Sequence, residues 1–449
     1  MKKVFLSVIG FSLICRLNAW SQTKEDTSRN SNPFSLHTPI GYDTADYRPR
    51  ALKLDEINLV SSYYKQNGSH STITGDNPNF LKNGVFTNSI AVTDVSNGLD
   101  LKLVWVGDNQ NKNSISLGIG IDHHTSASSA FLTTTGLGKQ GGTRIYPSFD
   151  WTIENGKTGN TFGIGAYYSG EYNYKSLGAD VHFSKKTNDK SGEFSAKLQA
   201  YFDQVTLIKP SELIKAITPP PGGGPVYITT ASGNVVLSSN GSSTSKPSLP
   251  TSPRNTFTAS TSYSQIINSR LQIMFLADVV AQSGYLGLPF HRVYFPGVDT
   301  AKIEKLPSSR FKLPLGFRAN YFVDDNIILR SYYRYYLDTW GSKANTANLE
   351  IAYKITPFFS ISPFYRYYEQ SASKYFAPFD AHSLNDQYYT SNYEYAKFQS
   401  SFYGIGFRIA PPKGVFGWQN LHELEIRYGH YSQTTDLVSD VLSINLGFK

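Results

Sequence analysis

Long runs of this chain alternate strictly between apolar and polar residues. In residues 310–321 every second position is apolar, the set being Phe311, Leu313, Leu315, Phe317, Ala319 and Tyr321. Successive side chains of a β-strand point to opposite faces, so a period of two predicts strands with one apolar face. The same alternation recurs at 144–154, 193–203, 326–338, 345–355 and 421–428. The predicted fold class is therefore all-β.

The length of the runs distinguishes a soluble β-sandwich from a membrane barrel. Apart from 421–428, they cover about 11–14 residues. Soluble strands usually have about 5–6 residues, and tilted strands that cross an outer membrane need the greater length. The connections also alternate, with short turns near 107–111, 155–160, 186–191, 267–270, 323–326 and 355–358 and long segments at 66–90, 125–142, 205–254, 283–308 and 371–395. This favours an antiparallel transmembrane β-barrel with short periplasmic turns and long extracellular loops.

About 16 strands are predicted, an even number as in bacterial single-chain barrels. Their places are 54–65, 92–106, 113–124, 143–155, 160–170, 174–185, 192–204, 255–267, 270–282, 309–323, 326–338, 344–355, 358–370, 396–410, 420–431 and 438–449. Pro147 and Pro314 lie inside two of these ranges, where they are expected to disturb pairing because proline has no N–H to donate.

The aromatic residues fit the same architecture. The chain has 31 Tyr and 28 Phe but two Met, and its charged fraction of 17% is below the usual quarter. Tyrosines at 332–336 and 365–368 are expected in aromatic girdles at the membrane interfaces. In the last strand, apolar residues through Phe448 alternate with polar or small ones, which resembles the signal that the barrel-assembly machinery recognises. Outer-membrane lipid and that machinery are the expected partners.

The N-terminus has the pattern of an export signal. Lys2 and Lys3 precede an apolar stretch over 4–14 that is too short to cross a bilayer as a mature helix. Residues 1–21 are interpreted as a signal peptide, with cleavage after Ala19 as the alternative to cleavage after Ser21. A lipoprotein would use Cys15, but Ile14 and Arg16 beside it disfavour that interpretation. The expected location is the outer membrane.

The mature chain then divides into a polar segment at 22–52 and a barrel at 53–449. Within the barrel, 205–254 is expected to be a long extracellular loop rich in Pro, Gly and Ser. Removal of the signal peptide lowers the formal charge from +8 to +5 and deletes the only Cys. Since no run of Lys or Arg occurs, nucleic acid is not an expected partner.

Charged residues on the polar faces would line the lumen. A basic strip is predicted from Arg310, Lys312, Arg318, Arg330, Arg334, Arg366 and Arg408. Facing a water-filled pore, it would attract anions. The alternative is that the inward acids Asp338, Glu350, Glu423 and Glu425 pair with it and fill the lumen.

Metal and hydrolase chemistry receive weaker support. Asp122 with His124 and Asp180 with His182 are Asp-x-His pairs that could contribute metal ligands, although their strands are not neighbours. Polar lumen residues are the favoured interpretation, and no cofactor is expected. A hydrolase would need a serine, a histidine and an orienting group within reach, and no Gly-x-Ser-x-Gly motif occurs. An enzyme is therefore not predicted.

Several segments together resemble an uncharacterised family of bacterial outer-membrane barrel proteins. They are residues 124–130, 287–295, 306–310, 330–336 with 344–346, 363–368 and 388–391. The resemblance covers most of the chain from about residue 52, and least of all 209–254. It implies an outer-membrane location but no known activity. Family members are often encoded beside flavin-transferase and thioredoxin-like proteins, which implies a periplasmic redox or flavin-modified partner.

Two functions follow as expectations. The first is a porin-like channel or transporter for small solutes, and the alternative is a closed barrel that serves as a scaffold for a periplasmic partner. Two serine-containing runs at the outer ends of strands are predicted to fold into the mouth and form its constriction: Ser126, Ser128, Ser129, Ser308 and Ser309.

Overall fold

The computed structural model describes residues 50–68, 81–82, 85–86, 92–133, 136–171, 173–208, 226–229, 235–238 and 250–449. The expected signal peptide at 1–21 lies outside these residues, as does most of the segment 22–52. Residues 50–52, the first residues described, belong to the first strand of the barrel.

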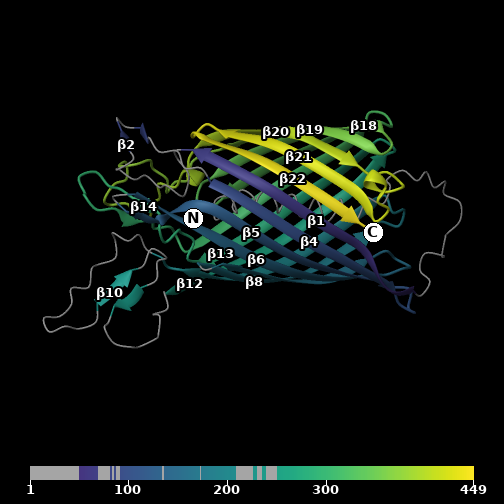
Figure 1. Cartoon of the computed structure of the whole chain (residues 1–449), viewed down its shortest axis with the longest axis horizontal. Helices are drawn as coiled ribbons and strands as arrows, with labels where there is room; N and C mark the ends of the chain where they lie inside the picture. The colour runs from purple at the N-terminus through teal and green to yellow at the C-terminus, as the bar shows by residue number, and fades with distance from the viewer. Residues whose placement is uncertain are drawn as a thin grey trace.

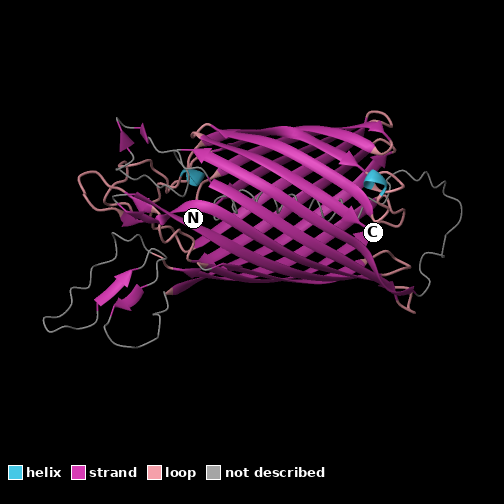
Figure 2. Ribbon diagram, viewed as in Figure 1, coloured by secondary structure: helices cyan, strands magenta, loops and turns pink. Residues whose placement is uncertain are grey.

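Sixteen antiparallel strands form one closed barrel (Figures 1 and 2). The strands are β1 (Arg50–Gly68), β4 (Val92–Val106), β5 (Lys112–Thr133), β6 (Gly136–Glu154), β7 (Thr161–Glu171), β8 (Tyr174–Lys186), β9 (Gly192–Thr206), β12 (Thr251–Asn268), β13 (Leu271–Gly284), β16 (Ser309–Phe322), β17 (Ile327–Asp338), β18 (Lys343–Thr356), β19 (Phe359–Gln370), β20 (Phe398–Ile409), β21 (Leu421–Gln433) and β22 (Leu437–Phe448). Closure comes from β1, which pairs with β22 on one side and β4 on the other. The predicted fold class and strand number are confirmed.

The small elements lie outside the barrel wall. Two-stranded ribbons are formed by β2 (Leu81–Lys82) with β3 (Val85–Phe86), β10 (Val226–Thr229) with β11 (Val235–Ser238), and β14 (Arg292–Val293) with β15 (Lys302–Ile303). Single 3-10 turns are η4 (Tyr393–Tyr395) and η5 (Val415–Gly417). Among the described residues, no helix is long and apolar enough to cross a membrane.

The predicted strand boundaries differ most from the structure at the outer ends. Strand β5 continues to Thr133 and β6 begins at Gly136, so most of the predicted loop at 125–142 is strand, and Ser126 pairs there with Gln140. Likewise 251–254 belong to β12 and not to the long loop. These extensions carry no regular apolar face, so the period of two does not reveal them.

Four prolines lie within barrel strands. Pro253, near the start of β12, pairs with Gln204 of β9, and each of the other three interrupts the pairing on one side. The β6–β7 pairing skips Pro147, the β13–β16 pairing skips Pro314, and the β18–β19 pairing skips Pro363. On the other side the ladder continues past each of them. Proline, which has no N–H to donate, is tolerated where the pairing with one of the two adjacent strands is interrupted.

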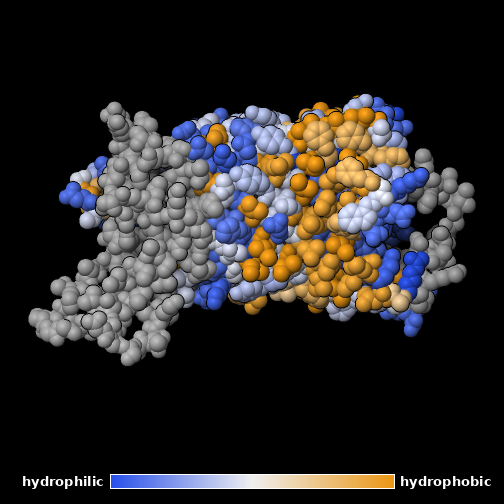
Figure 3. Space-filling model, viewed as in Figure 1, coloured by the Kyte–Doolittle hydropathy of each residue, from blue (hydrophilic) through white to orange (hydrophobic). Residues whose placement is uncertain are grey.

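Alternation divides the side chains between lipid and lumen. On the face shown in Figure 3, hydrophobic residues gather in a band across the barrel, nearer the end with the short turns, with hydrophilic surface on both sides of the band. On β16, for example, the exposed hydrophobic residues are Phe311, Leu315 and Tyr321, which all occupy odd-numbered positions. A continuous apolar belt on a closed barrel is the outer surface of a membrane-spanning protein.

The tyrosine clusters are only partly girdle residues. Tyr333 and Tyr365 face outward and are about half exposed. Tyr332, Tyr336 and Tyr368 occupy the alternate positions and face inward. The prediction that each whole cluster lies in a girdle is therefore wrong for these three, because neighbouring residues of a strand cannot share a face.

Substitution of Gly404 by alanine is expected to impair barrel formation. A Cβ there would lie 2.0 Å from the Tyr428 carbonyl oxygen and 2.8 Å from Gly429 Cα, so β20 and β21 would have to separate. Since backbone cannot move aside as a side chain does, we expect a cost of about 3 kcal/mol or more. The folded fraction is measured by the migration of unheated protein in SDS gels. Gly98→Ala is the control, because its Cβ meets open space; equal folding of both variants would contradict the prediction.

Candidate functional site

The predicted basic strip lies on the inner face, since each of its residues occupies the strand position opposite in parity to the lipid-facing ones. Three of its members are paired. Arg310 contacts Asp338, Arg330 Nη1 lies 2.9 Å from Glu350 Oε1, and Arg408 binds Glu423 through two hydrogen bonds of 3.0 and 2.7 Å. The alternative of a paired network is thus confirmed for these residues.

One further arginine joins this network, and aromatic rings hold two more members of the strip. Arg427 donates to Glu350 at 2.7 Å and to Glu425 at 3.2 Å. Arg318 lies 6.0 Å from the Tyr332 ring, and Arg366 lies 6.0 Å from the Phe402 ring. A guanidinium over a ring is weakly stabilised and keeps its charge.

The described residues nevertheless leave space in the lumen. The side chains of Arg330 and Arg408 point inward yet remain 48% and 37% exposed. On the facing wall, the Lys197 side chain is 36% exposed. Inward-facing charges exposed to this extent require room for water around them.

Acidic residues dominate the other side of the lumen, on strands β4 to β9. Inward acids there are Asp94, Asp100, Asp122, Asp150, Glu154, Glu171, Asp180, Glu193 and Asp203, against the inward bases Lys102, Lys112, Arg144, Lys186 and Lys197. In the order of the closed sheet, β4 to β9 lie opposite β16 to β21. We call the two sides the acidic wall and the basic wall. A charge difference across the lumen is the result.

The two predicted Asp-x-His pairs lie apart. Asp180 and His182 of β8 meet Asp150 of β6 across β7. Asp122 instead contacts Ser96 and accepts a 2.8 Å hydrogen bond from Tyr146. Ser116 of β5 pairs with Asp150, and Asp122 lies six residues further along the same strand. Asp122 and Asp150 are therefore about 20 Å apart.

The second histidine also belongs to a group of its own. His124 is 1% exposed, and its Nε2 lies 3.8 Å from Glu171 Oε1. A single site made from Asp122, His124, Asp180 and His182 is therefore contradicted, because β6 and β7 separate the pairs and their registers differ.

At the end opposite the short turns, two connections fold together (Figure 1). They are residues 285–308 and 371–397, which we call the cap. Lys305 and Tyr389 exchange two backbone hydrogen bonds of 3.0 and 2.8 Å between them. Their contact has a buried interior that includes Phe290, Val293, Phe295, His382 and Thr390. The cap is thus a folded unit.

The cap connects opposite sides of the barrel. Residues 287–290 line one small cavity with Tyr174 of β8 and Arg254 of β12. The other connection leads into β20, and seven strands separate β8 from β20 in either direction around the sheet. The Tyr395 ring lies 5.4 Å from the guanidinium of Arg310, an inward-facing residue of β16. The cap therefore spans the mouth and enters it.

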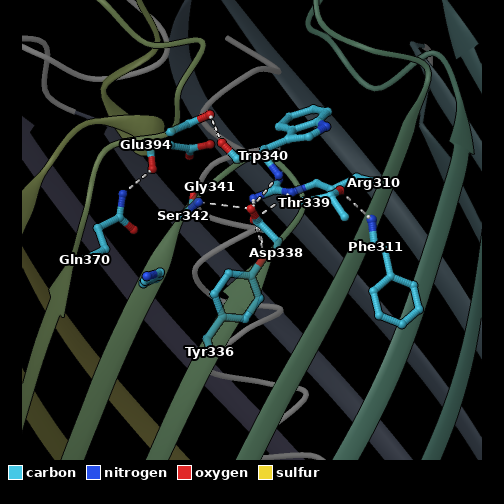
Figure 4. A network of polar contacts seen from close by, with 12 residues as sticks. Arg310, Phe311, Tyr336, Asp338, Thr339, Trp340, Gly341, Ser342, Gln370 and Glu394 are labelled. Carbon is cyan, nitrogen blue, oxygen red and sulfur yellow. Dashed lines mark hydrogen bonds and ion pairs between the residues drawn. The ribbon is translucent and has the colours of Figure 1, made fainter.

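An aspartate at the end of β17 organises the contact between cap and barrel (Figure 4). Asp338 accepts hydrogen bonds from Arg310 Nε at 3.0 Å and Tyr336 at 2.7 Å with one oxygen. Its other oxygen accepts from the backbone N–H groups of Trp340 at 2.9 Å and Ser342 at 3.1 Å. The carboxylate fixes the β17–β18 turn against β16.

That turn presents Trp340 to the cap. Trp340 is 1% exposed and donates from Nε1 to the Ser309 carbonyl at 2.9 Å. Its ring lies 5.9 Å from that of Tyr375 and 5.6 Å from that of Tyr395, and Arg310 lies 4.4 Å from it. The indole anchors residues 371–397 to the rim.

Glu304 joins the two connections of the cap. Its carboxylate accepts a 2.6 Å hydrogen bond from the Thr390 hydroxyl and another from the Leu288 N–H. Both donors are neutral, so they offset only part of the cost of burying a charge. Burial raises the pKa of Glu304 to about 7.

The predicted constriction is only partly described. Residues 126–129 lie in the outer extension of β5, and the side chains of Ser126, Ser128 and Ser129 lie outside the described set, so their role stays a prediction. Ser308 is exposed at the rim. Ser309 pairs with Ser283 at an outward-facing position, so its proposed place in the mouth is wrong, again because of strand alternation.

Asp150, Arg427 and Glu304 are site residues that were not predicted from the sequence. Asp150 needs the register across β7, where the spacing Gly163-x-Gly165 is the one sequence signal for a gap. Arg427 follows the same parity as the predicted strip and could have been included. Glu304 lies in a segment without periodicity.

Comparison with known families resolves the relationship of the chain. Residues 139–440 match the family described as protein of unknown function, DUF3570. The chain belongs to this family. The predicted resemblance to an uncharacterised family is confirmed, whereas the link to flavin-transferase and thioredoxin-like neighbours stays a prediction. None of the curated proteins matches the sequence of this DUF3570 protein.

Solved structures with similar architecture include several outer-membrane proteins. A TodX mutant, described as a monoaromatic hydrocarbon channel, has a TM-score of 0.38 at 11% identity. The match covers 90% of this chain and 91% of the TodX chain. OprD of Pseudomonas aeruginosa has a TM-score of 0.38 at 8% identity, with coverages of 88% and 94%. A BenF-like porin of Pseudomonas fluorescens has the same score and identity, with coverages of 88% and 98%. At these values no substrate carries over.

Trp340→Ala is expected to release residues 371–397 from the rim. Loss of a buried indole costs about 3–5 kcal/mol, which falls on the cap because the barrel ladders do not involve the side chain. Amide exchange within 371–397 should rise while the strands stay protected. Trp418→Ala, at an exposed tryptophan, is the control. Unchanged exchange in the cap would contradict the anchoring role.

The cap is also expected to loosen as pH rises from 4.5 to about 7. The folded pKa of Glu304, about 7, exceeds its ordinary value of 4.5. The folded cap thus binds an extra proton between these values and loses stability from pH 4.5 to 7. The loss is at most about 3 kcal/mol. Proteolysis of residues 285–308 as a function of pH measures it. Glu304→Gln should remove this dependence; a variant that keeps the wild-type profile would refute the assignment.

Proposed function

We propose that this DUF3570 protein is an outer-membrane channel for small polar solutes. The observation that carries the proposal is the exposure of inward-facing charged side chains in a closed barrel of sixteen strands, Arg330 above all. Barrels of 16–18 strands are wide enough to leave an aqueous path. The apolar belt supports the membrane location, and the expected export signal supports the outer membrane.

The opposed walls would act on the solute as it passes. A dipolar or zwitterionic solute is oriented by a field across the lumen, since its negative end is attracted to the basic wall and its positive end to the acidic wall. Small molecules that carry both charges, or one charge and several hydroxyl groups, suit such a lumen better than apolar ones. Because the cap spans the mouth, it would limit the size of what enters.

Conductance in planar bilayers tests the channel. The purified full chain should give discrete, ohmic openings. Arg330→Gln should lower the permeability of anions relative to cations several-fold at 0.1 M salt and less at 1 M, because the screening length shortens from about 10 to about 3 Å. Arg270→Gln changes an exposed residue of the β12–β13 turn and is the matched control.

A second candidate function is a scaffold for a periplasmic partner. At the short-turn end, the connection between β20 and β21 presents Phe416 at 89% exposure and Trp418 at 57%. Phe416 adopts a left-handed backbone with φ of 55°, an arrangement that costs energy for a non-glycine residue. A folded barrel without conductance, even after Trp340→Ala, would reject the channel and favour this scaffold.

A further inference from the structure

The acidic wall brings three possible metal ligands together on strands β6 and β8. Asp150 and Asp180 both pair with Gly165, so they lie level with each other on either side of β7. His182 Nδ1 lies 2.9 Å from Asp180 Oδ1 and 3.9 Å from Asp150 Oδ2. One ligand atom from each residue lies within 4.8 Å of the other two.

Strand β7 makes room for this group by lacking side chains there. A Cβ on Gly163 would lie 2.1 Å from His182 Nε2, and one on Gly165 would lie 2.3 Å from Asp180 Oδ2. Any other residue at either position would displace the imidazole or the carboxylate. The two glycines therefore allow side chains from non-adjacent strands to meet.

Neighbouring residues hold the remaining polar atoms of the three side chains. Asp180 Oδ2 accepts hydrogen bonds from Tyr167 and, at 3.1 Å, from Lys197. Thr152 Oγ1 donates to Asp150 Oδ1 at 3.0 Å and lies 3.3 Å from His182 Nε2. Such outer contacts orient ligands in metal sites.

The closest contact within the group joins His182 to Asp180. A carboxylate oxygen only accepts hydrogen bonds, so Nδ1–H of His182 donates to Asp180 Oδ1 at 2.9 Å. Asp150 Oδ2 lies 3.9 Å from the same nitrogen. A cation that displaces this proton would meet one imidazole nitrogen and two carboxylates.

We propose that Asp150, Asp180 and His182 bind a divalent first-row transition-metal cation at the lumen wall. Imidazole with carboxylates suits Zn²⁺ and its neighbours, whereas Ca²⁺ and Mg²⁺ prefer oxygen ligands alone. Lys197 balances one of the two carboxylates, which leaves a net negative charge for the cation. His182 and Asp150 are 24% and 16% exposed to the lumen, so water or a passing solute completes the coordination.

Calorimetric titration of the chelator-treated full chain in detergent with Zn²⁺ alone tests this site. The wild type should bind one ion through this group, and Asp150→Asn and His182→Gln should each weaken that binding at least tenfold. Gly163→Ala should have the same effect although it removes no ligand. The readout does not require an open channel, so it stands apart from the conductance test.

Matched controls separate the site from other histidine–carboxylate contacts. His430→Gln alters a pair with Asp440 at 2.8 Å that has one carboxylate and faces outward. Gly98→Ala adds a Cβ to an inner face where nothing lies within 4 Å. Both should bind Zn²⁺ as the wild type does. The proposal is overturned if the wild type binds none, if Mg²⁺ binds equally well, or if Asp150→Asn and His182→Gln retain wild-type affinity.

Discussion

Every backbone N–H and C=O of a strand within hydrocarbon needs a partner from the protein, because lipid offers none. The pairing of β1 with β22 removes the last two free edges and closes the sheet. Once the ladders are complete, each strand can only alternate between lipid and lumen. The apolar belt outside and the charged walls inside are two consequences of that closure, and the glycine pair on β7 and the prolines are tolerated because the remaining ladder stays intact.

Much of the fold could be predicted because this alternation is written directly in the residues. Parity alone placed Arg318, Arg330 and Arg408 in the lumen, and the structure agrees. Tyrosine identity was a poorer guide than parity, since Tyr332 and Tyr333 lie on opposite faces although both belong to one cluster. The end of β5 at 125–133 could not be predicted as strand, because the residues there do not alternate between apolar and polar.

The candidate sites depended on information that a single sequence lacks. Whether Asp150 meets Asp180 is decided by the register of two intervening pairings, and a shift of one residue in either would turn one carboxylate toward lipid. The cap is held by contacts such as that between Glu304 and Thr390, which lie 86 residues apart. Irregular segments of this kind fold through particular hydrogen bonds and ring contacts, so composition indicates only that they are loops.

The path of the cap has a mechanical consequence. A tube of paired strands resists stretching along its ladders but deforms easily from a circle to an oval. The cap is attached near β8 on one side and near β20 on the other, so it holds the diameter of the barrel between these strands fixed at the outer end. Widening of the mouth and flattening of the barrel are therefore coupled motions. A molecule that pushes the cap aside also changes the distance between the acidic wall and the basic wall beneath it.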